Sequence, residues 1–173
     1  GTTYTVTFYP SDEGAKTINV AAETFTDGVG NNNSAATEFN WTYDTTAPTL
    51  TDSSPTDGVS EVSTTANIVL TFSEVVVAGT GNILISTASL SDGAFATIPV
   101  GGSRSDGTSS ISGNVVTINP TGTFTSLGTY NVQIPATGFD DSAGNSYAGT
   151  VDATTLNFII AEVDTTNPIL SSS

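Results

Sequence analysis

Apolar and polar residues alternate with a period of two along most of the chain, and no window shows the i, i+3, i+4, i+7 spacing of an amphipathic helix. The clearest alternation covers residues 66–72, where Ala66, Ile68, Leu70 and Phe72 share one face of a predicted strand. The same pattern predicts strands at residues 4–8, 17–21, 39–43, 82–86, 94–100, 114–119, 129–134 and 154–161. Short strands separated by Asp-Gly and Gly-Asn turns predict an all-β, antiparallel Greek-key sandwich.

The alternation also predicts which side chains meet inside the sandwich. One face of each strand should line a common core, because successive side chains point to opposite faces of a sheet. The expected core residues are Ala66, Ile68, Leu70, Phe72, Val116, Ile118, Tyr130, Val132, Ile134, Leu156 and Phe158.

An internal repeat predicts the domain boundaries. The string D-T-T-A-P at residues 44–48 returns 120 residues later as D-T-T-N-P at 164–168, and each copy follows a loop that ends in Gly-Asn. These loops are residues 25–31 and 139–145. We therefore expect the C-terminal strands of one domain at 1–43, a hinge at 44–48, a complete domain at 49–163, and a second hinge leading into a new strand at 164–173.

The first 43 residues are too few to cover both faces of a sandwich. Their apolar positions need a second sheet that this stretch does not supply, and two sources are open: the first unit is the truncated end of a domain, or strands of another chain complete it. The positions concerned are Val6, Phe8, Ile18, Val20, Phe39 and Trp41.

Composition narrows the chemistry to oxygen ligands. The chain has no His, no Cys and no Met, so it offers no imidazole base, no thiolate and no nitrogen or sulfur metal site. A net charge of −15, with 17 Asp and Glu against 2 Lys and Arg, disfavours nucleic acid and anionic membrane surfaces. No apolar run is long enough to predict a membrane span. We expect a protein that is not an enzyme.

The hinge and loop strings resemble those of bacterial Ig-like tandem repeats, the extender domains of large extracellular adhesins and surface proteins. The stretch W-T-Y-D-T-T-A-P-T at 41–49 is typical of them, and the second unit resembles the type also found in S-layer proteins through S-P-T-D-G-V at 54–59 and I-V-L-T-F-S-E at 68–74. The resemblance implies a seven-stranded sandwich, an extracellular location, a spacer or adhesive role, and calcium at domain junctions.

Calcium is the ion that suits a chain rich in carboxylates and amides, because it takes six to eight oxygen ligands. If the last strand returns beside its neighbour, the second loop and the second hinge meet and supply Asp140, Asp141, Asn145 and Asp164. The corresponding first set is Asp27, Asn31 and Asp44, with Asp57 from the following domain. The alternative is that these residues only form Asx-turns, with Gly30 and Gly144 at positive φ. Glu74, at the end of the strand predicted at 66–72, could add a further ligand or could be an exposed charge at a strand end, and the second interpretation is favoured.

Three functions follow from these observations. The first is a structural extender whose junctions are stiffened by calcium and whose partners are neighbouring repeats or other copies of the chain. The second is a module that binds a glycan or another extracellular surface, for which Trp41 and Tyr43 on one strand face would supply an aromatic platform, although a Trp in a sandwich more often packs in the core or at a domain junction. The third is a filament or surface-layer subunit completed by strands of a neighbouring chain.

Overall fold

The computed structural model describes residues 5–87, 93–125, 127–164 and 166. The chain divides into two compact units, Gly1–Thr46 and Ala47–Ser173, and this division falls inside the predicted hinge at 44–48. The predicted second hinge and new strand at 164–173 lie outside the described residues, except for Asp164 and Thr166. The described part contains strands and turns but no helix, and so no helix that is long and apolar enough to cross a membrane.

The described residues of the first unit contain one antiparallel strand pair. β1 (Gly14–Ile18) pairs with β2 (Phe39–Tyr43), with Gly14 opposite Tyr43 and Ile18 opposite Phe39. β2 has the predicted bounds, whereas β1 starts three residues earlier than expected. The predicted strand at 4–8 is wrong for residues 5–8, which form no strand, and Tyr4 lies outside the described residues.

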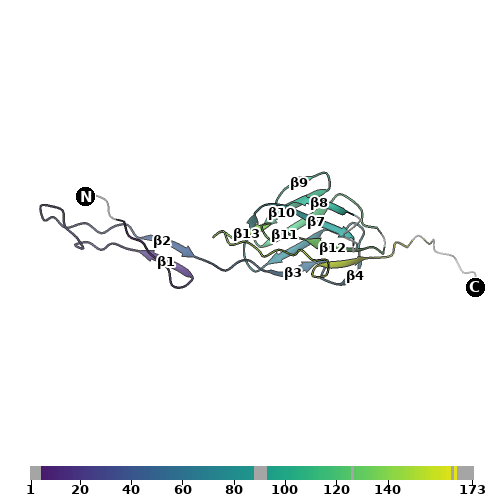
Figure 1. Ribbon diagram of the computed structural model, residues 1–173, viewed down its shortest axis with the longest axis horizontal. Coiled ribbons are helices and arrows are strands. Elements are labelled where there is room, and N and C mark those ends of the chain that lie inside the picture. Colours follow the sequence, from purple (N-terminus) through teal and green to yellow (C-terminus); the bar gives the residue numbers. More distant parts are fainter. Residues whose placement is uncertain (1–4, 88–92, 126, 165, 167–173) are drawn as a thin grey trace, which may run out of the picture. The chain divides into compact units, whose positions relative to one another are not determined.

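The second unit is a sandwich of two five-stranded sheets (Figure 1). The first sheet has the order β3-β5-β11-β10-β9 and the second has the order β4-β14-β12-β7-β8. The strands of the first sheet are β3 (Leu50–Ser54), β5 (Ile68–Phe72), β9 (Ser103–Arg104), β10 (Gly107–Ser112) and β11 (Val115–Pro120). Those of the second are β4 (Val59–Val62), β7 (Asn82–Thr87), β8 (Ala94–Pro99), β12 (Thr129–Gln133) and β14 (Asn157–Ile160).

The core lies between these sheets and follows the predicted alternation. Ten of the eleven expected core residues are buried; Ala66 is half-buried because a turn, closed by the hydrogen bond from Ala66 N to Ser63 O, precedes β5. Aromatic rings fill both ends of the core: Phe72 contacts Phe139 at 5.1 Å between ring centroids, and Phe124 contacts Tyr130 at 4.8 Å. The all-β sandwich is therefore confirmed.

One strand pair departs from the antiparallel prediction. β4 runs parallel to β14, with Val59 opposite Phe158 and Val62 opposite Ile160. A short antiparallel pair, β6 (Val77–Ala78) with β13 (Phe139–Asp140), lies beside the sandwich at the end where β3 begins. We call this end the N-terminal pole and the end where the chain leaves after β14 the C-terminal pole. Figure 1 shows β13 at one end of the second unit and the outgoing chain beside β4 at the other.

Candidate functional site

The two loops of sequence D-x-x-G-N have the same structure. In each loop, Oδ1 of the aspartate accepts hydrogen bonds from the backbone N–H groups two and four residues later, at 2.9 Å for Asp27 and 2.8 Å for Asp141. The side chain of Asn31 or Asn145 donates to the other carboxylate oxygen, at 2.9 and 2.7 Å. The glycine before each asparagine has a φ of 92° or 94°, as the turn requires. These bonds are the Asx-turns of the alternative interpretation.

The loops differ in how much solvent reaches the carboxylate. Asp27 is exposed, whereas Asp141 is 3% exposed. Burial alone would raise the pKa of Asp141, but the hydrogen bonds from Asn145 and from the loop N–H groups outweigh it and hold this pKa below its usual value. The hydrogen bond from Asn31 does most to lower the pKa of Asp27. At neutral pH the second unit therefore holds a charged carboxylate that is almost completely buried.

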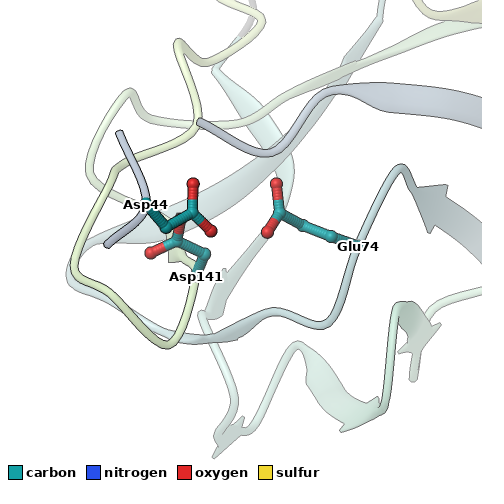
Figure 2. Close-up of side chains that lie close together, drawn as sticks. All are labelled: Asp44, Glu74 and Asp141. Atoms are coloured by element: carbon teal, nitrogen blue, oxygen red, sulfur yellow. The ribbon is translucent and has the colours of Figure 1, made fainter. Parts of the chain in front are cut away.

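A second carboxylate lies next to this one. An oxygen of Glu74, which is half-buried, lies within 4.8 Å of an oxygen of Asp141. Figure 2 shows the Glu74 side chain extending from the segment after β5 toward the loop that carries Asp141. Two carboxylates this close repel each other unless a cation or a proton lies between them. The interpretation of Glu74 as an exposed strand-end charge is wrong, because the chain turns back after Phe72 at the N-terminal pole.

The incoming chain is fixed beside this pair. Thr49 N donates to Ser73 Oγ at 3.0 Å, and Ser73 N donates to the Thr49 carbonyl at 2.8 Å. Ser73 directly precedes Glu74, so the first residues of the second unit are anchored one residue from the carboxylate pair. The carboxylate pair therefore lies where the chain enters the second unit.

The second hinge does not meet the loop of its own unit, which corrects the predicted set. β14 is antiparallel to β12, with Asn157 opposite Asn131 and Ile159 opposite Thr129. It therefore runs away from the loop that follows β12 and carries Asp164 to the C-terminal pole. There Oδ1 of Asp164 accepts a hydrogen bond from Thr166 N at 2.8 Å, and the hydrogen bonds of Thr166 lower the pKa of Asp164.

The first unit repeats this arrangement. β2 ends opposite Gly14, whereas the loop with Asp27 and Asn31 lies beyond the Ile18 end of the pair. Asp44 therefore leaves the strand pair at the end away from that loop, and the prediction that these three residues meet is wrong for the same reason. The hinge of each unit points away from the loop of that unit.

The remaining predicted ligands have structural roles. Oδ1 of Asp57 accepts hydrogen bonds from Asn157 N at 3.0 Å and Asn157 Nδ2 at 2.9 Å, and so fixes the turn before β4 to the start of β14. Asp140 accepts a hydrogen bond from Ser146 Oγ. Among the described residues, neither Asp57 nor Asp140 belongs to a cluster of three or more acidic side chains.

Comparison with known families agrees with this architecture. A model of the family described as "Bacterial Ig-like domain" matches residues 44–159, which is more than half of the chain. The chain belongs to the bacterial Ig-like domain family. Bacterial Ig-like domains are generally structural modules without enzymatic activity, and they typically occur in surface or extracellular proteins. A search of curated proteins found no match.

Sequence reasoning also missed a contact at the first hinge of this Ig-like protein. The carboxylate of Glu13 accepts hydrogen bonds from Thr45 N at 2.9 Å and from the Thr46 hydroxyl at 2.9 Å, so it holds the D-T-T string from the turn before β1. The register of β1 with β2, which places Gly14 opposite Tyr43, brings these segments together. No local motif signals this contact, because 32 residues separate Glu13 from Thr45.

Proposed function

We propose that the chain is an extender segment of a secreted or surface-anchored, adhesin-like bacterial protein, and that Ca²⁺ at the N-terminal pole of the complete domain stiffens its junction. The supporting observation is the Glu74 and Asp141 pair beside the incoming chain. Membership of the Ig-like family supports the structural role. This set differs from the one expected from sequence, because it joins the loop of a domain to the hinge that precedes it.

The donor set fits a hard cation. Asp141 stays ionised because it accepts hydrogen bonds from Asn145 and from the loop N–H groups, and an ionised carboxylate of this kind can also bond a metal. Glu74 adds a second carboxylate within 4.8 Å. Calcium prefers such oxygen ligands and accepts irregular geometry, so two carboxylates, nearby carbonyls and water form a suitable set.

Asp44 is the residue of the hinge that would complete the set. It lies five residues before Thr49, whose backbone is anchored at Ser73. Five extended residues span at most about 17 Å, so the chain is long enough for Asp44 to reach the pair. A cation held by Asp44 together with Glu74 and Asp141 would remove the repulsion between these carboxylates and restrict the hinge. A chain of such junctions would transmit force as a stiff rod.

Calcium titration of the whole chain tests this proposal. Wild type should bind Ca²⁺ in calorimetry and unfold at a higher temperature in Ca²⁺ than in chelator, by roughly 10 °C at a hundredfold excess over the dissociation constant. Glu74→Gln should abolish both effects and leave the unfolding temperature in chelator unchanged or higher, because it removes repulsion. Asp44→Asn should weaken binding and leave the second unit folded.

Asp27→Asn is the matched control, because Asp27 makes the same loop hydrogen bonds and lies in the first unit. It should leave calcium binding unchanged. Equal unfolding temperatures of wild type in Ca²⁺ and in chelator would remove calcium from the proposal. The chain would then be a spacer whose junction depends on Pro48 and on the hydrogen bonds of Glu13.

A further inference from the structure

The strand pair of the first unit corresponds to a buried pair of the second. The string T-I-N-V at residues 17–20 returns as T-Y-N-V at 129–132, so Ile18 corresponds to Tyr130. Ile18 lies opposite Phe39, and Tyr130 lies opposite Phe158. β1 and β2 therefore correspond to β12 and β14, the two adjacent strands inside the second sheet of the sandwich.

Several side chains of the first unit are exposed although their counterparts in the second unit are core residues. Tyr130 and Phe158 are 2% and 1% exposed, whereas Ile18 and Phe39 are 39% and 62% exposed. The loop phenylalanines behave likewise: Phe139 is fully buried against Phe72 of β5, and Phe25 is 47% exposed. Phe25, Val6 and Val20 line an apolar hollow of about 540 Å³. An uncovered apolar surface of this kind needs a partner.

The second unit also shows which strands lie on each side of this pair. β12 pairs with β7 on its other side, and β14 pairs with β4. In the described part of the first unit, β1 pairs only with β2, so each has an edge without a strand. Exposed strand edges accept further strands through their backbone N–H and C=O groups.

One side chain marks the edge of β1 as a strand-binding edge. Asn131 is 1% exposed and donates from Nδ2 to the carbonyl oxygens of Ser86 and Thr87 on β7, at 3.2 and 3.1 Å. Asn19 occupies the corresponding position of the first unit and is exposed. It can make the same two hydrogen bonds only if a strand like β7 lies beside β1.

We propose that the first unit is the C-terminal part of a second Ig-like sandwich, and that strands preceding it in the same polypeptide bind its open edges, one like β7 on β1 and one like β4 on β2. The order of strands in the second unit selects this source. There β4 and β7 precede β12 and β14 in the sequence and belong to one continuous chain. A second sheet carrying the equivalent of Phe72 would then cover Phe25, Phe39 and Trp41.

The aromatic side chains of the first unit fit this role better than a glycan platform. Phe8 and Phe39 contact Trp41 at 5.6 and 5.7 Å between ring centroids. Phe39 corresponds to the buried Phe158, and Trp41, two residues further along the strand, corresponds to the buried Ile160. Phe39 and Trp41 therefore occupy core positions. This inference does not depend on calcium binding.

An extended chain tests the proposal. The extended chain consists of residues 49–127 followed directly by residues 16–173. Lys16 then follows residue 127 in the place that Gly128 has in the natural sequence. Trp41 is the only tryptophan and reports on the first unit alone. Compared with the 173-residue chain, its emission should shift to shorter wavelength, and amide exchange in β1 should slow by at least about tenfold.

Asn19→Ala separates strand binding from general compaction. In the extended chain it should reverse at least part of the protection of β1, and in the 173-residue chain it should change nothing. If the second unit is the one part of the extended chain that folds, the test uses the 173-residue chain with an added peptide of residues 80–87, which contains β7. This peptide should slow exchange in β1, and a control peptide with Ile83→Ser and Ile85→Ser should not.

Two results would overturn the proposal. The first is that neither the extension nor the peptide protects β1 or shifts the Trp41 emission. The second is that the 173-residue chain is a dimer by light scattering with β1 already protected, which would assign the edge to a second copy of the chain. A shift of Trp41 emission by oligosaccharides in the extended chain would likewise contradict burial of the aromatic cluster.

Discussion

The side chain of Asn145 donates a hydrogen bond of 2.7 Å to Oδ2 of Asp141, whose side chain is buried although the next three residues of the loop are exposed. Asp141 also accepts two backbone hydrogen bonds at 2.8 Å, so its carboxylate organises the whole turn. The same bonds occur at Asp27 in an exposed loop. The chain thus carries two copies of one turn in two environments, which allows the effect of burial to be measured.

Asp141→Ala should destabilise the second unit by about 1–3 kcal/mol, because it removes a buried acceptor and leaves the part-buried N–H groups of Ala143 and Asn145 without their hydrogen bonds. Calorimetric unfolding of the second unit in chelator measures this loss without a contribution from metal. Asp27→Ala should leave the same transition unchanged, since Asp27 belongs to the first unit. Equal effects of the two substitutions would show that the loop bonds of Asp141 do not stabilise the sandwich.

Acid should lower the free energy of unfolding of the second unit by protonating Asp141. Its pKa is lower in the folded protein than in the unfolded chain, so its contribution to stability is fully present above the unfolded pKa, near 4, and is lost as the pH falls through the folded pKa. Urea unfolding of the second unit between pH 2 and 7 should show this loss below about pH 4. Asp141→Asn should give a shallower decline, and a slope equal to that of wild type would contradict the assignment.

Gly79→Ala should destabilise the N-terminal pole. A Cβ at Gly79 would lie 2.2 Å from the carbonyl oxygen of Thr137, and the bond from Gly79 N to the Gly138 carbonyl at 2.9 Å holds these segments together. The backbone must therefore separate β6 from β13, at a cost of about 1–3 kcal/mol. Gly28→Ala, where no atom lies within 4 Å, is the control and should unfold like wild type. Thermal unfolding in chelator compares the two.

The hydrophobic alternation predicted the core because burial on one face leaves a two-residue period in the sequence. It failed where a polar residue is buried: Ser109 of β10 is 5% exposed and donates through Oγ to the Pro99 carbonyl at 2.7 Å, so β10 carries no apolar pattern. It also failed at residues 5–8, whose apolar positions alternate but have no described strand to pair with. Period alone does not specify pairing.

The candidate site was predictable only in part. The repeat identified the loop with Asp141, since Gly and Asn at fixed positions indicate a turn. Whether a hinge meets a loop depends on strand direction, and the antiparallel pairing of β14 with β12 carries Asp164 to the opposite pole. The approach of Glu74 to Asp141 joins residues far apart in sequence and leaves no local signal.

Glu13→Ala should loosen the first hinge without unfolding either unit. Glu13 is the acceptor for Thr45 N at 2.9 Å and for the Thr46 hydroxyl at 2.9 Å, and the Thr45 hydroxyl also donates to it. These bonds, those of Thr45 first, lower the pKa of Glu13, so the carboxylate is ionised at neutral pH and accepts strongly. Without it, the Thr45 amide should exchange with solvent several times faster.

Asp12→Ala, one residue earlier, is the control, because Asp12 bonds to Lys16 and not to the hinge. Amide exchange at neutral pH, followed at Thr45 and at the β1 amides, distinguishes the two variants: Glu13→Ala should act on Thr45 alone, and an equal rate in wild type and Glu13→Ala would mean that the hinge is held by other contacts.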